Sequence, residues 1–175
     1  MNKKTMYILV AALVIVIVVA GIGIYLYMGT GDGGGGGGGG ENTYTVSNAT
    51  SLQFEANVTS QGYTIPYKLA GKNLGTANLT LRIDLLGGEA GNYSYILNAG
   101  DKTAWEAIEG VWTDKSSDFN AQWASWGTQW TGYVDALKSW SGTGDYSYTA
   151  TDGSSIKTYD ISINPTLSDS LFQHS

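Results

Sequence analysis

A run of 23 uncharged residues, 6–28, lies close to the start of the chain and consists almost entirely of apolar side chains. About 20 such residues in a helix cross the hydrocarbon core of a membrane. Lys3 and Lys4 precede the run, and the next basic residue is Lys68. Since positive charge is retained on the cytoplasmic side, we expect a single-pass cell-membrane protein with a cytoplasmic N-terminus and an extracellular C-terminal domain.

Two other interpretations of this run stay open. A cleaved signal peptide has an apolar core of only about 7–15 residues, and 18–20 (Val-Val-Ala) is a fair match to a cleavage site. A minor pilin subunit also begins with a short basic stretch and an apolar helix, although no processing site separates the lysines from the run. We expect a retained anchor over residues 1–28.

Residues 29–40 comprise Gly-Thr-Gly-Asp and eight further glycines. Polyglycine buries too little to offset the entropy of ordering it, so this segment is predicted to be a flexible linker. The domain that follows, 41–175, has 14 acidic and 7 basic residues, a net charge of −7. It is long enough for one hydrophobic core.

Most of this domain shows the alternation of apolar and polar residues that is typical of half-buried strands. The clearest case is 52–59, whose apolar positions are Leu52, Phe54, Ala56 and Val58. Segments that contain glycine separate it from further predicted strands at 64–69, 77–85, 93–98, 102–108, 111–113, 146–150 and 156–163. The pattern predicts an antiparallel meander with a final hairpin.

The period changes to that of a helix between 119 and 140. Large apolar residues recur there at alternating spacings of four and three, which predicts one apolar face on a helix of about 22 residues. These residues, here called the aromatic stripe, are Phe119, Trp123, Trp126, Trp130, Tyr133, Leu137 and Trp140. They are expected either to pack on the sheet as core or to line an apolar groove for a hydrophobic ligand.

Composition excludes several classes of function. The chain has no Cys, one His and a net charge of −6, which argues against thiolate chemistry, zinc sites and nucleic-acid binding. Glu106 and Glu109 could form an acid–base pair, but such residues more often line a solvated strand end. His174 lies where chains fray. We therefore expect no enzyme activity, no catalytic or metal-binding residues and no cofactor.

Four Asn-X-Ser/Thr sequons lie in the domain that is predicted to be outside the membrane. Asn57 and Asn78 are out of phase with their apolar neighbours and should point away from the core. If the sequons are glycosylated, all four asparagines belong on solvent-facing positions. The candidate N-glycosylation sites are Asn48, Asn57, Asn78 and Asn92.

Several short strings follow one another in a characteristic order. They are 98–102 (Asn-Ala-Gly-Asp-Lys), 104–106 (Ala-Trp-Glu), 110–112 (Gly-Val-Trp), the long helix, the closing hairpin and 164–172. This layout is similar to the LolA-like fold of lipoprotein carriers and related cell-surface lipoproteins, over most of 44–172. The resemblance implies an α+β domain in which a curved antiparallel sheet, a half-barrel, is covered by a long amphipathic helix.

Members of the LolA-like fold hold acyl chains between the sheet and its covering helices, and they contribute no catalytic residues. This chain is shorter than the carriers, which implies fewer strands or a smaller cavity. The resulting hypothesis is a membrane-tethered extracytoplasmic module that binds a lipid or another hydrophobic ligand. The alternatives are a structural or adhesion-type glycosylated surface domain without a pocket, and a minor pilin-like subunit. The sequence does not indicate an oligomeric state.

Overall fold

The computed structural model describes residues 45–87, 91–150 and 153–174. The predicted anchor at 1–28 and the predicted linker at 29–40 lie outside the described residues. Within the described residues, no helix is both long and apolar enough to span a membrane.

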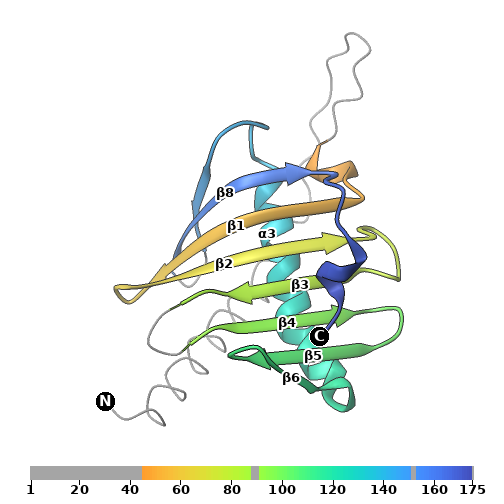
Figure 1. Ribbon diagram of the computed structural model, residues 1–175. Helices are drawn as coiled ribbons and strands as arrows, with labels where there is room; N and C mark the ends of the chain where they lie inside the picture. Colours follow the sequence, from red (N-terminus) through yellow and green to blue (C-terminus); the bar gives the residue numbers. More distant parts are fainter. Residues whose placement is uncertain (1–44, 88–90, 151–152, 175) are drawn as a thin grey trace.

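The described chain is an α+β domain with an open, eight-stranded antiparallel sheet and one long helix, which confirms the predicted class (Figure 1). The strands follow one another through hairpins from β1 to β6, and the final hairpin joins at the β1 side. The sheet order is therefore β6-β5-β4-β3-β2-β1-β8-β7. The strands are β1 (Ser51–Ser60), β2 (Tyr63–Lys72), β3 (Thr80–Leu85), β4 (Tyr93–Asn98), β5 (Thr103–Ile108), β6 (Val111–Asp114), β7 (Tyr146–Thr149) and β8 (Ser155–Ile163).

Strand β1 shows how the alternating pattern places the core. Leu52, Phe54, Ala56 and Val58 are buried on one face, and the residues between them are half-buried or exposed on the other. A short 3-10 turn, η1 (Val46–Asn48), precedes the strand. The buried face of each strand could be predicted from the sequence, because a shift of one residue would turn all of its apolar side chains to the solvent face.

The third strand begins later than expected. The chain between Lys72 and Thr80 is a loop instead of an extension of β3. Asn73 adopts a left-handed conformation (φ 60°), and both the backbone N–H and the hydroxyl of Thr76 donate to its carbonyl. Local side-chain bonds of this kind compete with strand pairing. Asn78 therefore lies in the loop and not on the polar side of a strand.

A bulge in β8 re-aligns the apolar residues of that strand. Ile156 and Thr158 pair with Val58 and Ala56, but the register shifts between Gln53 and Glu55. Asp160, with φ of 50°, is the inserted residue. One extra residue reverses the face on which the following side chains lie. Ile161 and Ile163 consequently pack against the same core as Ile156.

The long helix contains 22 residues and lies across one face of the sheet (Figure 1). It begins as a 3-10 turn and includes a π-helical turn near its middle. Its segments are η2 (Ser116–Asp118), α2 (Phe119–Gln122), η3 (Trp123–Gly127) and α3 (Thr128–Leu137). Trp140 lies beyond the end of the helix, and its indole N–H donates to the carbonyls of Thr143 and Gly144 at 3.1 and 3.0 Å.

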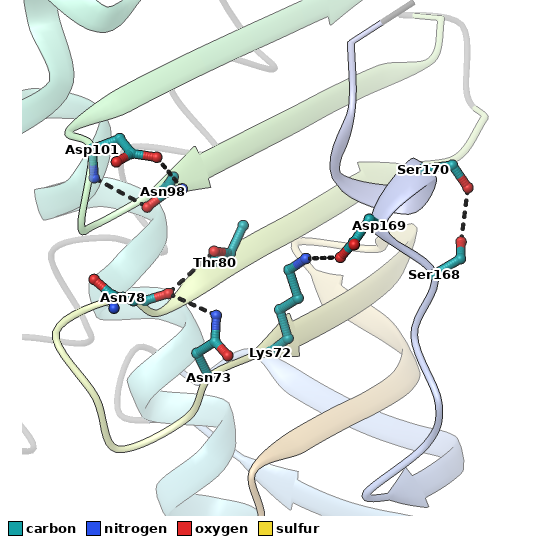
Figure 2. Close-up of polar contacts among 9 residues, drawn as sticks. All are labelled: Lys72, Asn73, Asn78, Thr80, Asn98, Asp101, Ser168, Asp169 and Ser170. Carbon is teal, nitrogen blue, oxygen red and sulfur yellow. Dashed lines mark hydrogen bonds and ion pairs between the residues drawn. The ribbon is translucent and has the colours of Figure 1, made fainter.

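The C-terminal segment 165–174, here called the strap, lies on the opposite face of the sheet from the helix (Figure 1). It contains a 3-10 turn, η4 (Asp169–Phe172). Lys72 on β2 forms an ion pair with Asp169 at 2.6 Å (Figure 2). Its ammonium group also lies over the Phe172 ring, 4.6 Å from the ring centroid. Arg82 on β3 donates to the Leu171 carbonyl at 3.0 Å and contacts the Trp112 ring.

The strap extends as far as β5, where the His174 ring stacks on Trp105 with a centroid distance of 3.4 Å. The expectation that His174 would be frayed is therefore wrong. Ile96 is the register partner of both Arg82 and Trp105 and is buried on this face. The sheet thus has a small second apolar cluster that the strap shields from water.

Candidate functional site

The aromatic stripe faces the sheet. Phe119, Trp126, Trp130, Tyr133 and Leu137 are buried. The other two members, Trp123 and Trp140, are half-buried and pack against the same core. The helical period in the sequence therefore identified the face of the helix that contacts the sheet, although Trp140 does so from beyond the helix end.

Contacts between rings fix the middle of this interface. Trp130 stacks on Phe54 of β1 with a centroid distance of 5.8 Å, and Tyr133 meets the same ring edge-on at 5.6 Å. Trp126 contacts Tyr95 of β4 at 4.4 Å. Aromatic pairs at these distances contribute about 0.5–1.5 kcal/mol each beyond the burial of their area.

The closest approach of helix and sheet occurs at Gly71 on β2. A Cβ atom at this position would lie 2.5 Å from the Trp130 ring. Only the absence of a side chain allows the indole to lie directly on the strand. At this point the interface is a packed core, without room for a ligand.

The π-helical turn η3 lies between the two ends of the stripe. Its first residue, Trp123, stacks on Phe119 at 5.6 Å and lies over Gly127, where a Cβ would approach the indole to 2.9 Å. π-Helical turns are rare, and those that do occur are frequently found at functional sites. No period in the sequence indicates this turn, because the four-and-three spacing continues through it.

Five of the six tyrosines that lie in or against the core, which we call the tyrosine belt, bring hydroxyl groups into the same interface. They come from three strands and the helix, namely Tyr67 on β2, Tyr93 and Tyr95 on β4, Tyr133 on α3 and Tyr148 on β7. Tyr67 influences the pKa values of both Tyr95 and Tyr133, and Tyr148 also influences that of Tyr133. The members therefore lie close enough to interact electrostatically.

The centre of the belt contains an unpaired hydroxyl. Tyr67 is 1% exposed, and its Oη has no hydrogen-bond partner among the described residues. Burial raises the pKa of Tyr67 to about 12, and the neighbouring Gln129 amide partly offsets this rise without reaching hydrogen-bond geometry. Gln129 is itself buried and donates through Nε2 to the Tyr133 hydroxyl at 3.3 Å.

One end of the belt is charged. Burial raises the pKa of Tyr95, and the negative charge of the neighbouring Glu106 raises it further. Glu106 in turn forms an ion pair with Lys115 at 3.4 Å. Glu109 has a different partner, the backbone N–H of Asn92 at 2.9 Å. The two glutamates therefore have separate structural contacts.

The tyrosine belt was not identified from the sequence. Tyrosine favours strands in general, so its presence in them does not by itself indicate a site. The available signal is phase. Tyr67 is in phase with the apolar residues Ile65 and Leu69, and Tyr95 is in phase with Leu97, so each lies on the same face as these residues. Phase assigns a tyrosine to the buried face, but it does not show which groups lie opposite its hydroxyl.

Three of the four sequon asparagines are exposed, namely Asn48, Asn78 and Asn92, and Asn57 is half-buried. The side chain of Asn57 lies on the face away from the helix, where its Oδ1 accepts from the Tyr159 hydroxyl at 3.4 Å. In Figure 2, Asn78 lies beside Asn73 and Thr80, which both donate to its backbone carbonyl. The predicted outward placement of Asn57 and Asn78 agrees with this arrangement.

The described part of the chain contains no group of three or more His, Cys, Asp or Glu residues arranged to hold a metal ion. Comparison with known proteins gave no match to a protein-family model, to a curated protein or to a solved structure.

Proposed function

We propose that the chain is a membrane-tethered module that binds an amphipathic ligand, a lipid or another largely apolar molecule, outside the cytoplasmic membrane. The observation that carries this proposal is the Tyr67 hydroxyl, which is buried and unpaired between helix and sheet. An unsatisfied buried polar group costs about 1–3 kcal/mol. A purely structural core has no need for this cost, since Phe would fill the same space.

The surroundings of the hydroxyl fit such a ligand. Indole and phenol rings of the aromatic stripe supply apolar contact area, and the tyrosine belt supplies hydrogen-bonding groups. Ligand sites are commonly apolar with a few polar groups that orient the ligand. The LolA-like resemblance points to the same region, because in that fold the ligand lies between sheet and helix.

Mass spectrometry of bound lipid tests the proposal. The full chain would be extracted from its membrane in a mild non-ionic detergent and analysed for co-purifying small molecules. A chain that ends at residue 44 serves as the control, because it retains the predicted anchor and the lipids around it. We expect about one additional amphipathic molecule per full-length chain. Identical lipid profiles for the two chains would contradict the proposal.

A second function is favoured by a different observation. Trp130 packs directly on Gly71, and this part of the interface is filled. On this alternative the domain is a structural or adhesion-type surface module, with exposed sequons and an acidic surface that keep it soluble. Identical lipid profiles in the extraction experiment would support it.

A further inference from the structure

The four sequons are not equivalent in the folded domain. A glycan transferase must reach both the asparagine amide and the hydroxyl group two residues later, because the Asn-X-Ser/Thr motif contains both. The two groups must therefore lie at the surface, in a segment that can move away from its neighbours without disruption of a strand. The burial and strand pairing of these residues decide which sequons the folded domain offers.

The first sequon, at 48–50, lies entirely outside the sheet. Asn48 is the last residue of the 3-10 turn η1, and Thr50 directly precedes β1. Both residues are exposed. The Asn48 Oδ1 accepts from the backbone N–H of Thr45 at 2.8 Å. This bond leaves the Asn48 Nδ2, the atom to which a glycan is attached, directed to other partners or to solvent.

Release of this segment leaves the sheet intact. Ala49 is buried, so residues 48–50 must lift from the surface to enter a transferase. Thr50 donates to the Asn164 Oδ1 through its backbone N–H at 2.7 Å and through its hydroxyl at 3.1 Å, and its carbonyl accepts from the Leu74 N–H at 3.0 Å. Asn164 and Leu74 both lie just beyond strand ends. The movement therefore breaks bonds between loops and no pairing between strands.

In the other three sequons, the hydroxyl residue is part of a strand. Thr59 lies in β1, Thr80 in β3 and Ser94 in β4, and each has a register partner on both neighbouring strands. None of the three is exposed. Thr80 is the most buried of them, and its hydroxyl donates to the Asn78 carbonyl at 3.2 Å (Figure 2). Exposure of the asparagine alone is therefore insufficient, since transfer requires a strand to leave the sheet.

We infer that the folded domain accepts an N-linked glycan at Asn48 and not at Asn57, Asn78 or Asn92. The donor is an oligosaccharide linked to a lipid through a diphosphate. The Asn48 Nδ2 loses one proton to a base of the transferase and forms a bond to C1 of the first sugar. The bond between C1 and the diphosphate oxygen breaks, and the lipid diphosphate leaves with the electron pair.

A glycan at this position has a defined place in the molecule. Asn48 follows the predicted linker at 29–40 closely in the sequence. Modification would therefore put a bulky, hydrated group where the chain enters the domain. The inference is independent of ligand binding between helix and sheet.

The test uses the full-length protein, folded in a non-ionic detergent, as the acceptor for a purified oligosaccharyltransferase that requires only Asn-X-Ser/Thr. A lipid-diphosphate-linked oligosaccharide is the donor. Four synthetic peptides, each with one sequon and its flanking residues, are acceptors in parallel reactions and report transfer to each motif without the fold. Mass spectrometry of proteolytic fragments measures the occupancy of each asparagine over time.

We expect all four peptides to be modified. In the folded protein, transfer to Asn48 should be at least about tenfold faster than transfer to any other sequon, because loops open more readily than paired strands. Thr50→Ala removes the hydroxyl of the motif and should abolish transfer to Asn48. Thr50→Ser is the matched control and should retain it.

Two results would overturn the inference. Transfer to Asn78 or Asn92 at the rate of Asn48 would show that strand pairing of the hydroxyl residue does not protect a sequon. Absence of a glycan on Asn48 in the folded protein would show that residues 48–50 do not lift from the surface. Loss of transfer in Thr50→Ser as well as in Thr50→Ala would also contradict it, because the hydroxyl would not be the group that is recognised.

Discussion

The Tyr67 hydroxyl has no hydrogen-bond partner among the described residues, so its removal should stabilise the fold. We predict that Tyr67→Phe raises the free energy of unfolding by about 1 kcal/mol, because the ring keeps its packing and the unsatisfied oxygen is lost. Chemical denaturation of the wild-type and variant proteins measures the change. Tyr63→Phe should leave stability within about 0.5 kcal/mol of wild type, as is usual for surface changes. A loss of stability in Tyr67→Phe would show that the hydroxyl has a partner.

Substitutions at two glycines separate the effect of close packing on stability from the effect of helix propensity. Gly71→Ala would place a Cβ 2.5 Å from the Trp130 ring, so we predict a loss of about 1–3 kcal/mol from overpacking. Gly132 lies in α3 with no atom within 4 Å of an added Cβ. Gly132→Ala should therefore gain up to about 1 kcal/mol from higher helix propensity. Unfolding midpoints in urea report both changes, and equal effects of the two substitutions would contradict the described contact.

At the scale of whole elements, the sequence predicted the features that depend on the local periodicity of apolar residues. Alternation in β1 and the four-and-three spacing from Phe119 onward each identify a buried face without knowledge of its partner. Features that depend on partners distant in sequence could not be predicted in this way. The pairing of β8 with β1, the approach of Trp130 to Gly71 and the unpaired Tyr67 hydroxyl are all of this kind.

The contacts of the strap could not be predicted from the sequence for a related reason. Its sequence has no apolar period, and its contacts are made with Lys72, Arg82 and Trp105, each 69 or more residues before its partner in the strap. The π-helical turn also has no signal, because a register change inside a helix does not interrupt the spacing of the large side chains. Local patterns therefore predicted the elements of the fold more completely than they predicted the candidate site.

The strap provides the prediction at element scale. Deletion of residues 168–175 removes the partners of Lys72, Arg82 and Trp105, and it uncovers the apolar cluster around Ile96. We predict faster amide hydrogen exchange in β4 and β5, because shielding from water is lost there. Exchange in β1 should change little, since its two neighbours β2 and β8 remain paired. Uniform acceleration in all strands would instead indicate that the strap supports the whole sheet.

At the scale of the whole molecule, the buried tyrosines should make the fold sensitive to alkaline pH. Burial raises the pKa of Tyr67 to about 12 and also raises the pKa values of Tyr95, Tyr133 and Tyr148. In the unfolded chain tyrosine ionises near pH 10. Above that pH the unfolded state loses protons that the folded state retains, so stability falls as pH rises.

Below pH 10 the contribution of these tyrosines is fully present. For Tyr67 alone, the difference in pKa corresponds to roughly 2–3 kcal/mol lost by pH 12. Urea unfolding at pH 8 and pH 11 measures the effect, and Tyr67→Phe should lose less stability between these two values than wild type. Equal losses in the two proteins would contradict the burial of this hydroxyl.

The orientation in the membrane is the remaining prediction for the whole molecule. Lys3 and Lys4 precede the apolar run, and the residues from 29 to 67 contain no Lys or Arg, so the positive-inside rule places the described domain outside. Protease added to intact cells should therefore remove this domain, and an epitope tag at the N-terminus should remain protected until the cells are lysed.

The double variant Lys3→Glu/Lys4→Glu removes the charge asymmetry, and we expect it to protect a substantial fraction of the domain from protease. Glu replacement leaves residues 41–175 unaltered, so a tag at the C-terminus reports orientation without a change in folding. Complete protection of the wild-type domain in intact cells would reverse the predicted topology and, with it, the placement of the ligand site outside the membrane.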